Sequence, residues 1–254
     1  MTTKYDGIAG KVAIVTGAGG GIGEAYARAL AEQGARVAVA EIDKDKGEAV
    51  AAGLRAAGHE AAYVEVDVGS PESTAAMAEQ VVAAFGGIDF LVNNAAIFGG
   101  MKLESMLRVD WDYYQRFMNV NMNGALLCTR ACFRTMRKRG GGAIVNQSST
   151  ASWMGVGYYG LAKAGMNALT HALAKELGHA KIRVNAIAPG PTDTDALAKQ
   201  VPEAFQKTLV ASLPLARLGT TQDMANACLF LLSDSASWVT GQIFAVDGGQ
   251  IVRA

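Results

Sequence analysis

The sequence has few cysteines and no excess of either charge. Its three cysteines, Cys128, Cys132 and Cys228, do not form a disulfide framework, and no histidine lies near them in sequence to complete a zinc site. We expect small buried side chains at these positions and no metal centre. The formal net charge of zero gives no electrostatic reason to expect nucleic acid or an anionic membrane as a partner.

Long apolar runs are also missing. No stretch of about 18 consecutive apolar residues occurs, which excludes an ordinary transmembrane helix. Residues Met1 to Gly7 lack the apolar core of a signal peptide. We therefore expect a cytoplasmic protein.

Short apolar runs alternate with longer helical patterns along the whole chain. Several runs are β-branched without polar alternation, which is typical of parallel strands covered on both faces. The stretches between them have the length of crossover helices. We expect one α/β domain over residues 1–254, with a doubly wound, seven-stranded parallel sheet and helices on both faces. The predicted strands are Val12–Val15, Arg36–Ala40, Ala61–Val66, Ile88–Val92, Ala143–Asn146, Arg183–Ala188 and Ile243–Val246.

One interval departs from this alternation. Between Gly190 and Thr221 the sequence has no strand pattern. An insertion of this length beside a ligand site often acts as a lid. We therefore expect a substrate lid at about residues 191–220.

A glycine-rich turn follows the first predicted strand. Gly17, Gly21 and Gly23 fit the spacing T-G-x-x-x-G-x-G rather than the common G-x-G-x-x-G. Glycines between a strand and a helix let backbone N–H groups approach a pyrophosphate. Glu41 stands 20 residues after Gly21, at the end of the second apolar run, where a carboxylate can bind adenosine ribose hydroxyls. The pattern predicts NAD as cofactor, because this carboxylate would repel the 2′-phosphate of NADP.

Tyr159 and Lys163 lie four residues apart in a helical pattern. Four residues turn a helix by about 40°, so the two side chains share one face. Tyr158 is five residues from the lysine and points elsewhere on the helix. Alone, such a pair is a weak signal, and its neighbours decide its meaning.

Hydroxyl and amide side chains accompany this pair. Ser148 and Ser149 follow the predicted strand Ala143–Asn146. They would stand at its carboxyl end, which is where open α/β sheets bind ligands. Asn121 lies inside another helical pattern, where asparagine is a poor helix former. Its role is either part of the site or a structural bridge.

Further motifs extend the set over nearly the whole chain. The stretches concerned are Thr16–Gly23, Asp67–Val68, Asn93–Ala96, Asn121, Ser149, Tyr159 with Lys163, Asn185–Gly190, Val239–Gly241 and Asp247–Gly249. Together they resemble the short-chain dehydrogenase/reductase family. The resemblance implies a Rossmann-like fold and an NAD(H)-dependent oxidoreductase that interconverts a secondary alcohol and a ketone by hydride transfer.

The same resemblance implies roles for four catalytic residues. Tyr159 would be the general acid/base, and the Lys163 cation would lower its pKa and bind the nicotinamide ribose. Ser149 would orient the substrate oxygen, and Asn121 would support a proton relay through water. The hydride chemistry itself belongs to the cofactor.

The cofactor contacts implied by the resemblance come from every part of the sheet edge. The glycine turn and Glu41 would hold the pyrophosphate and adenosine, while Thr192 and Thr194 would lie at the nicotinamide end. The implied cofactor residues are Gly17, Gly20, Gly21, Ile22, Gly23, Glu41, Asp67, Val68, Asn94, Ala95, Tyr159, Lys163, Pro189, Thr192 and Thr194.

Some alternatives stay open at this stage. The interval from serine to tyrosine is shorter than the family's usual one, so Ser148 remains in reserve for the role of Ser149. An NADP-dependent 3-ketoacyl-type reductase is the nearest alternative function, and a non-catalytic NAD-sensing protein is a more distant one. The apolar residues that could select a substrate could equally belong to the core or to a subunit interface: Phe98, Met101, Trp153, Met154, Tyr158 and Leu197–Leu215. Family members commonly form tetramers, so the resemblance implies a homotetramer.

Overall fold

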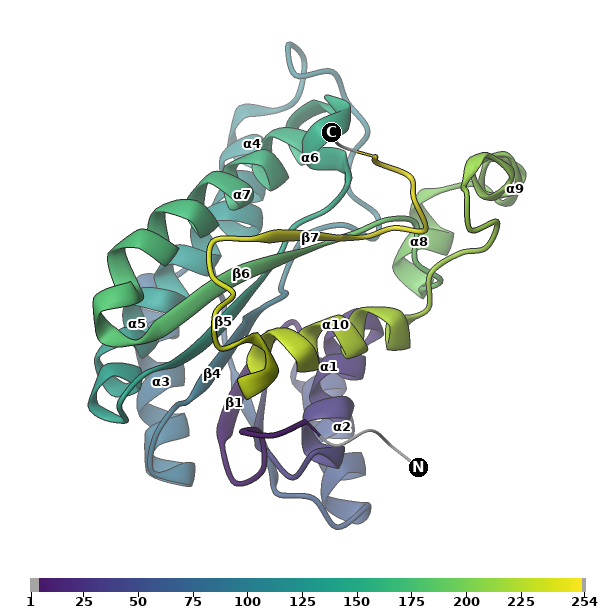
Figure 1. The fold of residues 1–254 in the computed structure, drawn as a ribbon. Helices are drawn as coiled ribbons and strands as arrows, with labels where there is room; N and C mark the ends of the chain where they lie inside the picture. Colours follow the sequence, from purple (N-terminus) through teal and green to yellow (C-terminus); the bar gives the residue numbers. More distant parts are fainter. Residues whose placement is uncertain (1–4, 253–254) are drawn as a thin grey trace.

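The computed structural model describes residues 5–252, and its centre is a seven-stranded parallel sheet (Figure 1). The strands lie in the order β3-β2-β1-β4-β5-β6-β7, so the chain builds outward from β1 in one direction and then from β4 in the other. This order confirms the predicted doubly wound, Rossmann-like sheet. The strands are β1 Val12–Thr16, β2 Arg36–Glu41, β3 Ala61–Glu65, β4 Phe90–Asn93, β5 Gly142–Gln147, β6 Ile182–Pro189 and β7 Ile243–Val246.

Helices cover both faces of this sheet. α1, α2 and α10 pack on the face that carries Ala13 and Val15 of β1, and α3, α5 and α7 pack on the face that carries Val12 and Ile14. Neighbouring side chains of a strand point to opposite faces, which explains why the central strands are apolar throughout. The helices are α1 Gly21–Glu32, α2 Lys44–Ala56, α3 Pro71–Phe85, α4 Trp111–Met118, α5 Gly124–Lys138, α6 Ala151–Met154, α7 Gly157–Leu177, α8 Asp195–Gln200, α9 Glu203–Ser212 and α10 Thr221–Leu232.

The 191–220 segment contains α8 and α9, which lie beside the carboxyl ends of β6 and β7 (Figure 1). Its two ends meet through a short parallel bridge between Thr192 and Gly219. Gly219 N donates to Pro191 O at 2.9 Å, and Asp193 N donates to Gly219 O at 2.8 Å. The two ends of this segment therefore lie side by side, and its role as a lid remains a prediction.

The three cysteines are buried and free, as the sequence predicts for small core side chains. Burial raises the pKa of all three thiols, so they are held as inert neutral groups. No helix within residues 5–252 is long and apolar enough to cross a membrane.

Candidate active site

One cavity of about 1210 Å³ runs along the carboxyl edge of the sheet. Its lining includes all fifteen predicted cofactor residues, contributed by the glycine turn, by the ends of β2 to β6 and by α7. Ser149, Tyr159 and Lys163 line the same cavity. Of the predicted site residues, only Asn121 is outside the lining, so the motifs that are distant in sequence meet in one place.

The glycine turn is shaped by close backbone contacts. Gly17 has a φ of +63°, and a Cβ there would lie 2.7 Å from Ala95 Cα. A Cβ on Gly23 would lie 2.1 Å from the Gly17 carbonyl oxygen, so neither glycine can be replaced without moving the backbone. Gly20, by contrast, has open space where a Cβ would be. Because no side chain caps α1 at Gly20, the first N–H groups of this helix are free to face a pyrophosphate.

Asn94 holds this turn against the end of β4. Its Nδ2 donates to the carbonyl oxygens of Thr16 and Gly17, both at 3.0 Å. The Thr16 hydroxyl in turn accepts from the backbone N–H groups of Asn94 and Ala95 at 3.0 and 3.1 Å. The side chain of Asn94 therefore positions the turn, and its predicted contact to the cofactor remains a prediction.

Glu41 ends β2 directly beside the turn. Its Oε2 accepts from Gly19 N at 3.0 Å, and its Oε1 accepts from the N–H groups of Ile42 and Asp43 at 2.9 and 3.2 Å. Sequence reasoning missed Lys46, which lines the same part of the cavity and forms an ion pair with Asp43 at 2.6 Å. Its spacing of three residues from Asp43, the N-cap of α2, is the signal that could have found it.

Asp67 and Val68 follow β3 at the same edge. Asp67 is exposed, and its Oδ1 accepts from Gly69 N at 2.8 Å. Val68 is buried next to it. This turn forms part of the cavity wall beside Glu41, and its predicted contact with the cofactor remains a prediction.

Tyr159 and Lys163 share one face of α7, as the spacing predicts. The Lys163 Nζ lies 5.9 Å from the centre of the Tyr159 ring and donates to the Gln147 carbonyl oxygen at 2.8 Å. Burial raises the pKa of Tyr159, while a hydrogen bond with the Ser149 side chain lowers it. Burial also lowers the pKa of Lys163 to about 8. Phe98 packs against Tyr159, with ring centres 5.3 Å apart, and limits the space over the phenol.

The two serines after β5 are distinguished by their partners. Ser148 is 2 % exposed, and its hydroxyl donates to Asn167 Oδ1 at 2.5 Å. Ser149 lines the cavity with Tyr159, and its side chain lowers the pKa of that tyrosine. Ser149 as the substrate-facing serine remains a prediction. The short interval to Tyr159 is closed by α6 and by Gly155, whose φ of +63° turns the chain toward α7.

Asn121 lies in a π-helical turn, η1 Asn119–Asn123, which interrupts the predicted helical pattern between α4 and α5. Its Oδ1 accepts from Ile97 N at 2.8 Å, and its Nδ2 donates to Ile97 O at 3.2 Å. The side chain is fully buried and bridges this turn to the segment after β4. These two hydrogen bonds fit the alternative of a structural bridge, and the role of Asn121 in a proton relay remains a prediction.

The apolar candidates divide into two groups. Phe98, Leu197 and Leu209 line the cavity. Met101 and Tyr158 instead belong to a separate core cluster around Phe117, and the Tyr158 hydroxyl donates to the Lys102 carbonyl oxygen. Trp153 and Met154 are also outside the lining. The apolar wall therefore comes mainly from the 191–220 segment and the chain after β4.

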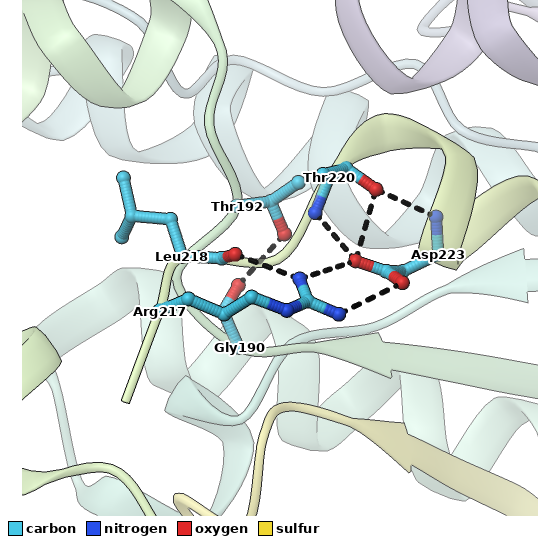
Figure 2. A network of polar contacts seen from close by, with 6 residues as sticks. All are labelled: Gly190, Thr192, Arg217, Leu218, Thr220 and Asp223. Carbon is cyan, nitrogen blue, oxygen red and sulfur yellow. Dashed lines mark hydrogen bonds and ion pairs between the residues drawn. The ribbon is translucent and has the colours of Figure 1, made fainter. Parts of the chain in front are cut away.

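A polar network fixes the end of the 191–220 segment to α10 (Figure 2). Arg217 forms a two-bond ion pair with Asp223, with Nη1 to Oδ2 at 2.7 Å and Nη2 to Oδ1 at 3.1 Å. Asp223 also accepts from Thr220 N at 2.7 Å within a capping box that begins α10. Hydrogen bonds from Arg217 and Thr220 hold the pKa of the Asp223 carboxyl well below its usual range. The segment is thus anchored, while α9 has no buried residue.

Comparisons with known proteins agree with this architecture. A family model described as enoyl-(acyl carrier protein) reductase matches residues 17–250. A relative in Bradyrhizobium diazoefficiens, named as a short-chain type dehydrogenase/reductase, is 46 % identical over 96 % of this chain and 88 % of its own. The chain belongs to the short-chain dehydrogenase/reductase family. The sequence motifs resemble this same family.

Other members of the short-chain dehydrogenase/reductase family are similar in sequence or in structure. An uncharacterized oxidoreductase of Mycobacterium tuberculosis (strain H37Rv) is 61 % identical over 96 % of this chain and 98 % of its own. A 7α-hydroxysteroid dehydrogenase complexed with NADH and 7-oxo glycochenodeoxycholic acid has a TM-score of 0.89 at 35 % identity, covering 98 % and 97 % of the chains. A structure named for an NAD(P)-dependent gluconate 5-dehydrogenase of Beutenbergia cavernae, with NADP at low occupancy, has a TM-score of 0.88 at 35 % identity, covering 95 % and 97 %.

Proposed function

We propose that this oxidoreductase interconverts a secondary alcohol and a ketone with NAD(H), using Tyr159 as the general acid/base. The observation that carries the proposal is the single cavity that joins the glycine turn and Glu41 at one end to Tyr159, Lys163 and Ser149 at the other. A dinucleotide is a ligand with a phosphate-rich middle and two different ends. The cavity offers binding surfaces in the same order along its length.

The residues of the cavity fit a dinucleotide. Gly20 leaves room above the N-terminus of α1, whose N–H groups and dipole favour a pyrophosphate. Glu41 can accept hydrogen bonds from two ribose hydroxyls, and its charge opposes a 2′-phosphate. Lys46 is a cation beside it in the cavity lining, but Asp43 holds it in an ion pair. We therefore propose NAD rather than NADP.

The proton transfer in this mechanism belongs to Tyr159. Its phenol would give a proton to the carbonyl oxygen during reduction, or take one from the alcohol during oxidation, while the bound nicotinamide supplies or accepts the hydride. Because burial alone raises the pKa of Tyr159, the phenolate needs a compensating charge. Lys163 provides it, and with a pKa of about 8 it is mostly a cation at neutral pH. Ser149 would hold the substrate oxygen near the phenol.

The apolar lining suggests the kind of substrate. Phe98, Leu197 and Leu209 would contact the body of a substrate whose oxygen points to Tyr159. The similar 7α-hydroxysteroid dehydrogenase is complexed with NADH and 7-oxo glycochenodeoxycholic acid. We propose an apolar secondary alcohol or ketone, admitted beneath a lid formed by the 191–220 segment.

The test is cofactor reduction by a panel of apolar secondary alcohols, followed through NADH absorbance. We expect turnover with NAD⁺, much less with NADP⁺, and a loss of about 10²- to 10⁴-fold in kcat for Tyr159→Phe with NADH affinity kept. A Tyr159→Phe protein with unchanged kcat would contradict the assignment of the acid/base. Tyr158→Phe is the matched control, since its hydroxyl bonds to Lys102 and not to the cavity.

An NADP-linked 3-ketoacyl-type reductase is the second candidate, favoured by Lys46 at the adenosine end of the cavity. Its signature is NADPH-dependent reduction of a 3-ketoacyl thioester exceeding any NADH-dependent rate. A non-catalytic NAD-sensing role has a different signature, namely tight NADH binding with no turnover of any alcohol or ketone.

We further propose that residues 1–254 act as one cytoplasmic domain assembled as a homotetramer. Light scattering coupled to size-exclusion chromatography tests the assembly. A stable monomer would exclude it.

A further inference from the structure

Gln147 is a buried amide at the centre of the cavity that the proposed mechanism does not use. It ends β5, is 7 % exposed, and lines the cavity directly before Ser148 and Ser149. Its main-chain carbonyl oxygen accepts from the Lys163 Nζ. Gln147 therefore lies between the helix that follows the glycine turn and the proton-transfer residues.

Tyr26 fixes the orientation of this amide. Tyr26 is fully buried in α1, and its hydroxyl donates to Gln147 Oε1 at 2.7 Å. Burial raises the pKa of Tyr26 well above its ordinary value, so the phenol keeps its proton and stays a donor. Because the oxygen of the amide is held by Tyr26, the nitrogen has to point the other way.

No hydrogen bond joins the amide nitrogen to another group among residues 5–252. The residue is 7 % exposed, but its nitrogen is not one of the fully enclosed unpaired polar atoms of this part of the chain, which are Asn93 Oδ1 and Thr129 Oγ1. An amide NH₂ carries two donors. Since Gln147 lines the cavity, these donors are open to an oxygen of the molecule that occupies it.

We propose that Gln147 Nε2 donates a hydrogen bond to an oxygen at the nicotinamide end of the bound dinucleotide, with Tyr26 fixing the direction of this donor. This inference rests on the proposed function for the class of ligand. Gln147 is then a binding residue that links α1 to the proton-transfer residues, and Tyr26 is a positioning residue that acts through it. This contact favours an oxygen acceptor on the ligand. It does not depend on whether Glu41 faces a ribose hydroxyl or a 2′-phosphate at the other end of the ligand.

The test compares NADH with 5′-AMP, which carries only the adenosine half, in fluorescence and competition titrations. Gln147→Met keeps the length of the side chain and removes the amide, so NADH affinity should fall by about 3- to 10-fold while 5′-AMP affinity stays unchanged. Tyr26→Phe should weaken NADH binding by a smaller factor, about 2- to 5-fold. Gln222→Met, an exposed amide on α10, is the control and should bind both ligands as the unchanged protein does.

Three results would overturn the inference. Unchanged NADH affinity of Gln147→Met, with or without a lower melting temperature, would make Gln147 purely structural. An equal loss of NADH and 5′-AMP affinity would mean a general distortion of the cavity. If the unchanged protein binds NADPH in place of NADH, the cofactor choice fails, and NADPH with 2′,5′-ADP replaces the ligand pair for the same comparison. If it binds neither dinucleotide, both the proposed function and this inference are wrong.

Discussion

The buried cation at the site should destabilise the fold at neutral pH. Lys163 is 2 % exposed, and burial lowers its pKa from 10.5 to about 8. A lowered pKa means that the unfolded chain binds this proton more tightly than the folded chain does. At about 1.36 kcal/mol per pH unit, the interval between the two values costs the folded state about 3 kcal/mol below pH 8.

Lys163→Met removes this cost together with one hydrogen bond. The Gln147 carbonyl oxygen loses its donor, which costs about 1 kcal/mol. We therefore expect Lys163→Met to be more stable than the unchanged protein by about 2 kcal/mol at pH 7, while its turnover is lost. A gain in stability with a loss of function is typical of a substitution in an active site.

The pH dependence separates the charge from the hydrogen bond. Between pH 8 and 10.5 the folded protein has lost the Lys163 proton and the unfolded chain still holds it, so the stability of the unchanged protein rises relative to Lys163→Met. We expect the difference to shift by about 3 kcal/mol across this interval in favour of the unchanged protein.

Urea unfolding followed by circular dichroism, without cofactor and at several pH values from 7 to about 10.5, measures this difference. Lys175→Met removes an exposed lysine from the same helix and should change the free energy of unfolding by less than about 0.5 kcal/mol. The reasoning is refuted if Lys163→Met is the less stable protein at pH 7 and the difference does not change with pH.

Two further predictions concern the neighbours of this lysine. Ser149→Ala should lower kcat by about 10²-fold, with stability nearly unchanged. Ser148→Ala should instead lose about 1–3 kcal/mol of stability, because Asn167 Oδ1 loses its donor. If kinetic and urea measurements on both variants show the opposite pattern, the two serines have exchanged roles. Asn121→Ala should cost about 1–3 kcal/mol through its two bonds to Ile97. If Asn121→Ala retains stability and loses only turnover, its side chain acts in catalysis and not as a bridge.

Most of the fold follows from local patterns in the sequence. The strands around Val12–Thr16 and Arg36–Glu41 are apolar on both faces, and each is followed by a helix long enough to cross the sheet. Parallel pairing then brings all carboxyl ends to one edge. For this reason Glu41 and Ser149, which each follow a predicted strand, could be expected at one edge of the sheet, whereas the role of Tyr159 followed from the resemblance to the family.

The remaining features depend on tertiary contacts that no local spacing specifies. The side chain of Asn121, in the π-turn, bonds to Ile97 in the chain after β4, a contact that the sequence does not specify. Tyr158 is an aromatic residue that could line either a substrate pocket or the core, and it packs into the Phe117 cluster. Likewise, the orientation of the Gln147 amide is set by Tyr26, which is distant in the sequence.

The central claim is that the cavity binds NAD(H) and that Glu41 accepts hydrogen bonds from the adenosine ribose. Titration of the purified protein with NADH and NADPH, followed through cofactor fluorescence, tests it most directly. We expect tight NADH binding and much weaker NADPH binding. In Glu41→Ala the difference between the NADH and NADPH affinities should be smaller, because this variant loses the ribose contacts and the charge that opposes the 2′-phosphate. A preference for NADPH, or a selectivity that is unchanged in Glu41→Ala, would contradict the account.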